Sequence, residues 1–266
     1  IDFDNAISTG ENVSCALMSI CLNNQKIKAK SLLSWQIPII TSSEHMKSRI
    51  LSINKKFLYD ELENFEVLVI PGFQGINNNG ELTTLGRGGS DTSAVAVAAA
   101  METECIIYTD VEGVFTTDPN IVPKAKKINK ISYEEMLELA SQGAKVLQTR
   151  SVELAMRKNT KLSVRSSFKP KKIGTMITDE KSVLENNTVS GITYSKDEAK
   201  ITLSRVQDKP GVSSKIFGPL AKGNINVDMI LQNISQDGKF ANLSFTLPRL
   251  DLEKALKILK KEKSII

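Results

Sequence analysis

Hydrophobic and polar positions in the first three quarters of the chain follow two alternating periods. Short apolar runs, several of them β-branched and typical of buried strands, occur at residues 28–32, 66–70, 105–108 and 162–165. Stretches with helical character lie between them, at residues 13–22, 55–63, 94–101 and 132–140. Strands that alternate with helices of this length predict a layered α/β domain with a mainly parallel sheet.

Three local signals sharpen this prediction. Residues 13–22 and 94–101 are so apolar that both are expected to form buried helices. Ser132, followed three residues later by Glu135, is a capping box that marks the start of a helix. Residues 71–72, Pro-Gly, end the preceding strand in a turn.

The last quarter of the chain has a different pattern. The polar stretch 169–187 separates two predicted domains, residues 1–187 and 188–266. The second domain reads as a strand, a helix that stops at Gly223, two strands joined by an Asp-Gly hairpin turn at residues 236–238, and a final helix. Its predicted elements are residues 200–206, 212–222, 225–234, 240–247 and 251–263. This order indicates a nearly complete ferredoxin-like α+β module.

The composition excludes several classes of protein. The 266 residues carry 35 Lys or Arg against 30 Asp or Glu, a net charge of +5 that is scattered along the chain. This mild excess argues against nucleic-acid binding, and the densest basic stretch, residues 169–172, is interpreted as a solvated linker. No run of about 18 apolar residues occurs, so no membrane span is predicted.

Cysteine and histidine are scarce. Cys15, Cys21 and Cys105 fit neither a disulfide framework nor a zinc site, which favours a reducing cytoplasm. His45 is the only histidine, and the G-x-S-x-G motif that would accompany it in a hydrolase is absent. We therefore assign His45 to the surface and Trp35 to packing, and we predict no metal site built by the protein.

The block most informative about chemistry is residues 85–91, Leu-Gly-Arg-Gly-Gly-Ser-Asp, directly before an apolar helix. Glycines let the backbone approach a ligand closely, and the N-terminus of the following helix attracts anions. The guanidinium of Arg87 suits a carboxylate or a phosphate, and Asp91 provides an acceptor for an amine or a metal ion. The alternative is a simple turn in which Ser90 or Asp91 only caps the helix.

A second polar block, residues 108–119, directly follows a buried strand. Ligands bind beyond the carboxyl ends of strands in open α/β sheets, and the two Asp and three Thr side chains of this block suit a nucleotide. A polar loop with Asx turns is the alternative. Residues 86–91 lack the last glycine of the dinucleotide fingerprint, and residues 218–224 lack the lysine of a P-loop, so neither site is predicted.

These motifs make the chain similar to the aspartate kinase family, whose catalytic domain has the amino-acid-kinase fold. The matching stretches are residues 8–11 (Ser-Thr-Gly-Glu), 71–75 (Pro-Gly-Phe-Gln-Gly), 83–91 (Thr-Thr-Leu-Gly-Arg-Gly-Gly-Ser-Asp), 108–113 (Tyr-Thr-Asp-Val-Glu-Gly) and 141–147 (Ser-Gln-Gly-Ala-Lys-Val-Leu). Residues 208–212 and 226–233 resemble the family's first ACT domain, a small regulatory module. The resemblance covers nearly the whole chain.

The resemblance implies a reaction and a set of residues. The reaction is the ATP- and Mg²⁺-dependent phosphorylation of the β-carboxylate of L-aspartate to 4-phospho-L-aspartate, the first step towards lysine, threonine, methionine and diaminopimelate. Glu11 would contact the aspartate amine and Arg87 would hold the α-carboxylate, while Asp91 would organise lysine and substrate near the transferred phosphoryl group. Arg87 and Asp91 are thus the implied catalytic residues. Residues that would line the carboxylate site are Gly88, Gly89 and Ser90.

Two further sites are implied by the same resemblance. The implied ATP pocket consists of Thr109, Asp110, Phe115, Thr116, Thr117, Asp118, Lys145 and Val146. The implied effector site for lysine or threonine consists of Asp208, Lys209, Pro210, Gly211, Val212, Ser213, Asn226, Val227, Asp228 and Gln232.

The sequence departs from the family at both ends and at two inner positions. The opening Lys-Phe-Gly-Gly-Thr-Ser strand, which supplies a lysine and part of the phosphate cradle, is absent, as are an initiator Met and a second ACT domain. Asn120 replaces the usual Arg, and residues 148–149, Gln-Thr, replace a His-Pro pair. The chain therefore resembles an aspartate kinase truncated at both ends.

The alternative to a kinase is a non-catalytic regulatory subunit that binds lysine or threonine through its ACT domain. A single ACT module exposes a sheet edge, so we expect a homodimer through residues 191–266.

Overall fold

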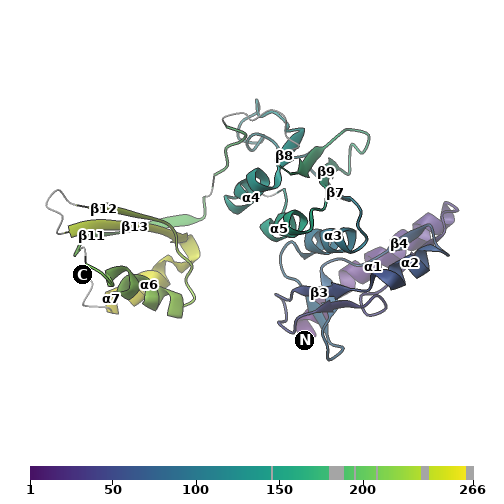
Figure 1. Cartoon of the computed structure of the whole chain (residues 1–266), viewed down its shortest axis with the longest axis horizontal. Coiled ribbons are helices and arrows are strands. Elements are labelled where there is room, and N and C mark those ends of the chain that lie inside the picture. Colours follow the sequence, from purple (N-terminus) through teal and green to yellow (C-terminus); the bar gives the residue numbers. More distant parts are fainter. Residues whose placement is uncertain (145, 180–188, 195, 208, 235–239, 262–266) are drawn as a thin grey trace. The chain divides into compact units, whose positions relative to one another are not determined.

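The computed structural model describes residues 1–144, 146–179, 189–194, 196–207, 209–234 and 240–261. The chain folds into two compact units, Ile1–Tyr194 (unit 1) and Ser195–Ile266 (unit 2), and each has a hydrophobic core of its own (Figure 1).

Unit 1 alternates helices with short strands, as the sequence predicts. Its described helices are α1 (Asp2–Asn24), α2 (Lys55–Leu62), α3 (Gly89–Ala100), α4 (Tyr133–Ser141) and α5 (Thr149–Lys158). Its described strands are β1 (Ala29–Ser31), β2 (Ile39–Thr41), β3 (Ile50–Ile53), β4 (Val67–Val69), β5 (Gln74–Ile76), β6 (Leu82–Thr84), β7 (Cys105–Thr109), β8 (Lys130–Ser132), β9 (Leu162–Ser166) and β10 (Thr175–Thr178). The capping box at the start of α4 is confirmed, since Ser132 Oγ accepts from the Glu135 N–H and the Glu135 carboxylate accepts from the Ser132 N–H.

The described strands of unit 1 form three sheets: the parallel pair β1–β4, a sheet of order β3-β2-β5-β6 and a sheet of order β7-β9-β10-β8. The pairs β1–β4, β2–β5, β7–β9 and β8–β10 are parallel, whereas β2–β3, β5–β6 and β9–β10 are antiparallel. The layered α/β architecture with mostly parallel strands is confirmed. The sequence missed β2, β3, β5, β6 and β8, which have three or four residues each; β1 and β4 are as short, but they lie within the longer apolar runs 28–32 and 66–70.

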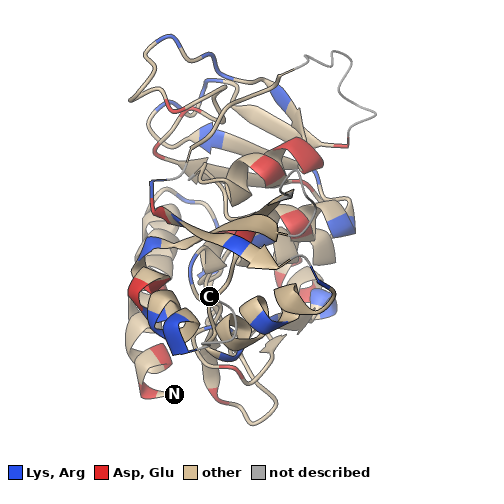
Figure 2. Cartoon of the chain, turned by 90° about the vertical axis from the view of Figure 1, so that its left-hand side faces the viewer, with Lys and Arg blue, Asp and Glu red and all other residues tan. Residues whose placement is uncertain are grey.

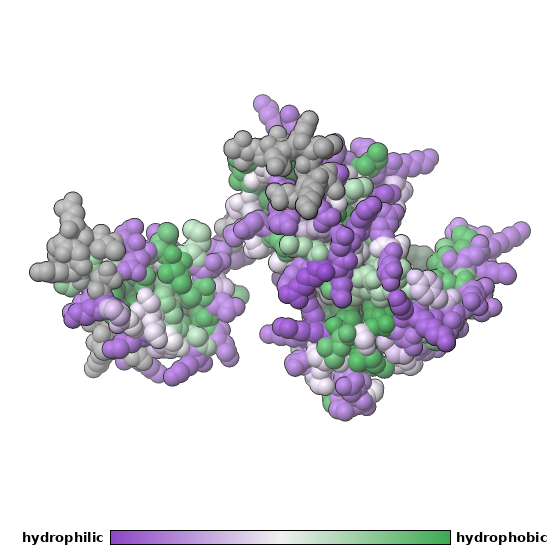
Figure 3. Space-filling view, in the orientation of Figure 1, coloured by the Kyte–Doolittle hydropathy of each residue, from purple (hydrophilic) through white to green (hydrophobic). Residues whose placement is uncertain are grey.

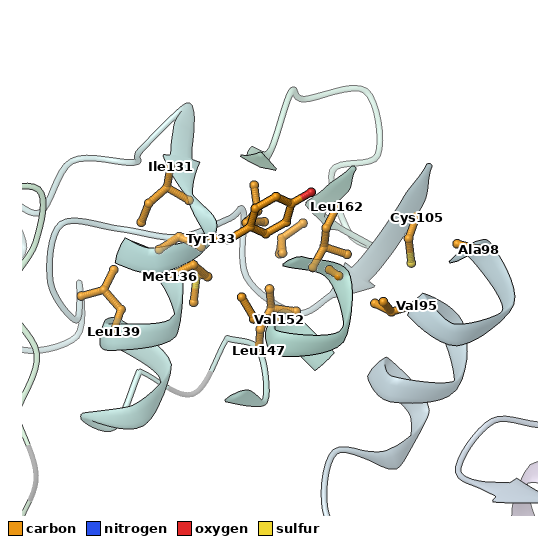
Figure 4. Packing of buried hydrophobic residues seen from close by; sticks show 14 residues of the cluster. Val95, Ala98, Cys105, Ile131, Tyr133, Met136, Leu139, Leu147, Val152 and Leu162 are labelled. Carbon is orange, nitrogen blue, oxygen red and sulfur yellow. The ribbon is translucent and has the colours of Figure 1, made fainter. Parts of the chain in front are cut away.

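Helix α3 lies between two cores of unit 1. Val95 and Ala98 pack in the larger core, with residues of α4, α5, β7, β8, β9 and β10 (Figure 4). Val97 packs against the smaller core of Leu32, Ile37, Ile39 and Leu58. Because α3 contributes to both cores, apolar residues occupy all of its sides, as the sequence predicts.

Helix α1 is less buried than the sequence suggests. Residues 13–22 are helical, but the side chains of Val13, Leu17, Met18 and Ile20 are more than half exposed, at 54–61%. Only one face of α1, which includes Cys15, packs against described elements, namely β1, β4 and β6. The predicted burial of this helix is therefore wrong, and hydrophobic side chains lie on the surface over α1 (Figure 3).

Unit 2 has the predicted ferredoxin-like order. Its described elements are β11 (Glu198–Gln207), α6 (Val212–Lys222), β12 (Asp228–Ile234), β13 (Phe240–Pro248), a 3₁₀ turn at Arg249–Asp251 and α7 (Leu252–Lys261). The sheet order is β11-β13-β12 and both pairs are antiparallel. Phe245 of β13 is fully buried in the core and meets Phe217 edge to face. The predicted turn at residues 236–238 lies outside the described residues.

The end of α6 differs from the prediction in one detail. Gly223 follows the helix, but its φ of −82° is ordinary, and Asn224 takes the left-handed conformation with φ of +52°. The Asn224 N–H donates to Ala221 O and the Ile225 N–H to Leu220 O. These are the bonds of a Schellman motif, in which asparagine replaces the expected glycine.

Candidate functional site

The predicted anion-binding block forms a tight glycine turn, here called the glycine turn (residues 86–89), between β6 and α3. Gly86 and Gly88 have φ of +78° and +69°, and the Gly89 N–H donates to Gly86 O at 3.0 Å. A Cβ on Gly86 would lie 2.5 Å from Met46 O, and a Cβ on Gly88 would lie 1.8 Å from Gln148 Cγ. Both positions therefore need glycine for conformation and for space.

The first turn of α3 has no side-chain cap. Its N-cap residue is Gly88, and neither Ser90 nor Asp91 accepts a capping hydrogen bond in this part of the structure. The first main-chain N–H groups of a helix have no partner within the helix and carry its positive dipole end. The interpretation that Ser90 or Asp91 only caps this helix is therefore wrong. Arg87 and Ser90 are exposed beside this helix end, which suits an anionic ligand.

Asp91 adds a carboxylate next to the same turn. Burial raises the pKa of Asp91, and the main-chain N–H of Gln148, which donates to this carboxylate, opposes that rise. Asp91 is half-buried in the first turn of α3, so its carboxylate can accept from a cationic group near this helix end.

Glu11 lies on α1, which is tied to the same region through two buried side chains. Asp4 is fully buried and accepts from Thr84 Oγ1 at 2.7 Å, at the end of β6. Gln74 is also fully buried, and its Nε2 donates to Ser8 O at 3.3 Å. These bonds connect α1 to β5 and to the strand that leads into Arg87.

His45 also contacts the buried carboxylate of Asp4. Its Nδ1 lies 2.6 Å from Asp4 Oδ2, and the Met46 N–H donates to the same oxygen at 3.3 Å. Burial would raise the pKa of Asp4, but the hydrogen bonds from Thr84, His45 and Met46 outweigh it and hold that pKa below its usual value. The His45 side chain is 27% exposed, so its predicted surface position holds in part, although one ring nitrogen contacts the buried Asp4. The predicted packing role of Trp35 is wrong, because Trp35 is 51% exposed.

The second predicted block follows β7, as expected. Thr109 ends β7, its hydroxyl donates to Asp110 Oδ1 at 3.1 Å, and its carbonyl accepts from the Ser167 N–H at 2.8 Å. Thr116 forms a main-chain bond with Lys126, and Asp118 Oδ1 accepts from the Asn120 N–H. The block is an ordered loop whose polar side chains from Thr116 to Asp118 are half-buried.

Lys169 and Lys172 fold back onto this loop. They donate to the Glu112 carboxylate at 2.5 Å and 3.3 Å, and these hydrogen bonds lower the pKa of Glu112. Residues 169–172 are exposed, as predicted, and two of their side chains form surface ion pairs. More generally, basic and acidic residues are interspersed over the described chain (Figure 2).

A model of the amino acid kinase family matches residues 1–166, and a model of the ACT domain matches residues 201–264. The chain belongs to the amino acid kinase family. The aspartate kinase of Pseudomonas putida is 48% identical over 261 residues, which are 97% of this chain and 63% of that protein.

Two solved structures of a relative resemble this chain. E. coli aspartokinase III in complex with lysine and aspartate superposes with a TM-score of 0.72 at 26% identity, covering 98% of this chain and 59% of that one. The same protein in complex with aspartate and ADP has a TM-score of 0.68 at 22% identity, covering 97% and 75%, and supports the fold. The chain spans just under two thirds of the length of the curated P. putida relative.

The residues predicted for the nucleotide come from two stretches of the chain, residues 109–118 after β7 and residues 145–146, and Val146 packs against the same core as Val114. Val146 lies two residues before Gln148, which contacts the glycine turn. Within residues 109–118, Thr109 O accepts from the Ser167 N–H, just after β9, and the Thr116 N–H donates to Lys126 O. Lys145 lies outside the described residues.

The predicted effector residues lie at two places of unit 2. Gly211 is the N-cap of α6, with Val212 and Ser213 in its first turn. Asn226 and Val227 precede β12, which Asp228 begins and which includes Gln232. Asp208 lies outside the described residues.

Four residues that contact the glycine turn or the strands before it were not predicted from the sequence: Asp4, Gln74, Gln148 and Arg150. Each contacts a residue far away in the sequence, so no local pattern marks it.

Among the described residues, no group of three His, Cys, Asp or Glu side chains could bind a metal ion. No helix in that part of the chain has the length and apolar character needed to cross a membrane.

Proposed function

We propose that this chain is the core of an aspartate kinase, which transfers the γ-phosphoryl group of ATP to the β-carboxylate of L-aspartate. The observation that carries the proposal is the uncapped N-terminus of α3 directly after the glycine turn, which carries the exposed Arg87 and is followed by the half-buried Asp91. The 48% identity with the P. putida aspartate kinase and the aspartate in the aspartokinase III complexes support this substrate.

In this proposal the glycine turn and α1 bind the α-carboxylate and the α-amine of aspartate. Arg87 donates two parallel hydrogen bonds to the α-carboxylate, and Gly88, Gly89 and Ser90 line the site, with main-chain N–H groups of Gly88 and Ser90. Glu11, half-buried on α1, accepts from the α-amine. The ties of Asp4 to Thr84 and of Gln74 to Ser8 support this arrangement, because they hold α1 against the strands that lead into the turn.

The β-carboxylate needs no general base, because a carboxylate is ionised at neutral pH. One of its oxygens attacks the γ-phosphorus, the bond to the bridging oxygen of ADP breaks, and the negative charge passes to ADP. Phosphoryl transfer depends mostly on positioning and on neutralising charge, and Asp91 contributes by holding a cationic group near the transferred phosphoryl.

ATP would bind along the loop after β7, with Thr109, Asp110, Phe115, Thr116, Thr117 and Asp118, and next to Lys145 and Val146. The hydroxyl and carboxylate groups of this loop suit a ribose and an adenine edge, and the ADP in the aspartokinase III complex supports a nucleotide here. Mg²⁺ would arrive with the nucleotide and be bound mainly by its phosphates, where it neutralises phosphate charge.

The affinity of the chain for L-aspartate, measured by calorimetry, tests the proposed aspartate site. We expect L-aspartate to bind, and Arg87→Ala to raise its Kd about 10- to 150-fold, because a hydrogen bond to a charged group contributes about 1.5–3 kcal/mol. Arg157→Ala is the matched control, since Arg157 is exposed and pairs only with Glu153 among the described contacts. Absence of aspartate binding at millimolar concentration would contradict the proposal.

A coupled ADP assay tests the reaction, with the chain extended at its N-terminus by the Lys-Phe-Gly-Gly-Thr-Ser segment of the family. We expect turnover that Asp91→Ala abolishes. Unchanged turnover in Asp91→Ala would count against the role assigned to this carboxylate.

We further propose that unit 2 binds a small amino-acid effector, lysine or threonine, through Lys209, Pro210, Gly211, Val212, Ser213, Asn226, Val227, Asp228 and Gln232, together with Asp208. The lysine in the aspartokinase III complex supports an effector of this kind. We expect lysine or threonine to raise the melting temperature of unit 2, and Asn226→Ala but not the exposed Asn64→Ala to remove this effect.

The second candidate function, a regulatory subunit, is favoured by the separate core of unit 2. The same titration discriminates the two. An effector that binds while ATP and aspartate do not would favour the regulatory subunit.

We propose that unit 2 also forms a homodimer through residues 191–266. Strand β12 is an edge of the sheet, and its side chains Met229, Ile230 and Leu231 are 51–61% exposed. A monomeric sedimentation profile at micromolar concentration would contradict this.

The proposed location is the cytoplasm, which is supported by three free thiols, at Cys15, Cys21 and Cys105.

A further inference from the structure

Arg150, in the first turn of α5, connects two loops that are distant in the sequence. Its Nη1 donates to Leu85 O at 3.0 Å and its Nη2 donates to Ser48 O at 2.8 Å. Leu85 and Ser48 are buried, at 2% and 0% exposure. The planar guanidinium suits this task, because it presents several donors in a fixed geometry.

The two carbonyls belong to the glycine turn and to the loop on which it rests. Leu85 immediately precedes Gly86 and lies two residues from Arg87. Ser48 belongs to the loop whose Met46 O approaches Gly86 so closely that a Cβ there would lie at 2.5 Å. Arg150 therefore holds the turn and its supporting loop together.

The residues around Arg150 contact the same turn further along. The side chain of Gln148 covers Gly88, and its main-chain N–H donates to the Asp91 carboxylate. Residues 148–150 thus touch the turn before its first glycine, at its middle and at Asp91. The turn that carries Arg87 is therefore contacted by the start of α5, while α1 bonds to Thr84 at the end of the strand before it.

The contacts of Arg150 are geometric rather than charge-neutralising. Among the described residues, no carboxylate lies within ion-pair distance of Arg150. Burial and the nearby Arg49 lower the pKa of its guanidinium, and the charge of Glu153 opposes this in part. An arginine remains charged in proteins even so. Its donors are used to fix two main-chain carbonyls.

We propose that Arg150 is a positioning residue for the carboxylate-binding turn, which it acts on through Leu85 O and Ser48 O. The proposal rests on the function proposed above for the aspartate site, but it makes a separate claim about the turn itself. Lysine should not replace Arg150, because a single ammonium on a flexible stem does not hold two carbonyls in a fixed geometry.

The test compares Arg150→Lys and Arg150→Met with Arg157→Lys and Arg157→Met. Arg157 lies on the same helix, and its side chain is 73% exposed. The first readout is hydrogen exchange of the Gly89 amide, which donates to Gly86 O inside the turn. We expect exchange at least tenfold faster in both Arg150 variants and within twofold of wild type in both Arg157 variants. Unchanged Gly89 exchange in Arg150→Lys and Arg150→Met would overturn the proposal.

The second readout is the affinity for L-aspartate and for ATP by calorimetry. We expect both Arg150 variants to raise the Kd of aspartate at least tenfold, with Arg150→Lys less affected, and to change the Kd of ATP less than threefold. An equal loss of both affinities would indicate a general structural role and overturn the proposal. Faster Gly89 exchange in a chain whose wild type binds no aspartate would support the positioning role and reject the aspartate site.

Discussion

At the scale of single residues, Gly88 has the strictest requirement in the candidate site. Its φ of +69° is unfavourable for residues with a Cβ, and a Cβ there would meet the side chain of Gln148. Gly80 has a similar φ of +77°, but a Cβ there would have nothing within 4 Å. A comparison of Gly80 with Gly88 therefore distinguishes the cost of backbone strain from the cost of a steric clash with Gln148.

We expect Gly88→Ala to destabilise the chain more than Gly80→Ala. Gly80→Ala should cost about 1–2 kcal/mol of unfolding free energy through backbone strain alone. Gly88→Ala should cost a further 1–3 kcal/mol, about the usual cost of overpacking, and should weaken aspartate binding. Urea unfolding measures both variants, and equal costs would show that Gln148 yields without penalty.

Asp4 makes the stability of unit 1 depend on pH. Its pKa in the folded chain lies below the unfolded value of about 3.9, so its stabilising effect is complete above that value and is lost as the pH falls through the folded pKa. We expect the unfolding free energy of wild type to fall more steeply below about pH 4 than that of Asp4→Asn, and the two curves to converge at acid pH. Urea unfolding at pH 7, 5, 4 and 3 measures this.

Asp2→Asn is the control for this measurement, because Asp2 is exposed on the same helix. Its stability should follow wild type at every pH. Parallel curves for wild type and Asp4→Asn would mean that the buried carboxylate does not contribute.

At the scale of elements, burial separates helices with similar apolar content. Helix α3 is surrounded by two cores, whereas α1 packs on one face and leaves Leu17 61% exposed. The capping box of α4 was predicted correctly because Ser132 and Glu135 interact within one turn. The conformation at the end of α6 was not, since glycine and asparagine both adopt the left-handed region and the sequence offers both at residues 223–224.

We expect substitutions in these regions to differ in cost according to burial. Leu17→Ala should change the unfolding free energy of the chain by less than about 0.5 kcal/mol, because it removes an exposed side chain. Ile37→Ala, at a fully buried position of the smaller core, should cost about 2–5 kcal/mol. Chemical denaturation compares the two, and a large cost for Leu17→Ala would show that its side chain is covered in solution.

At the scale of the whole molecule, two units with separate cores share one chain. The core of unit 2 centres on Phe245, Ile216 and Leu220, and contains no residue of the unit 1 cores. The chain thus combines an amino acid kinase domain with an ACT domain, each with a core of its own.

We expect Phe245→Ala to destabilise unit 2 selectively. Loss of a buried phenylalanine side chain costs about 3–5 kcal/mol, so amide exchange in β11 and β13 should become faster. The slowest amides of β7 and β9 should keep their wild-type rates. Uniformly faster exchange in both units would show that they unfold together.

The elements of this protein follow from local patterns, while the shape of its candidate site depends on distant contacts. Period, caps and turn residues act within a few positions, so they predict most helices, about half of the strands and the glycine turn that carries Arg87. The bonds that hold this turn join Asp4 to Thr84, Ser8 to Gln74 and Leu85 to Arg150, pairs that lie 80, 66 and 65 positions apart. A pattern within one segment contains no information about a partner so far away. Folding alone brings these groups within hydrogen-bonding distance, and the same limit explains why the exposed face of α1 and the buried contact of His45 were not foreseen.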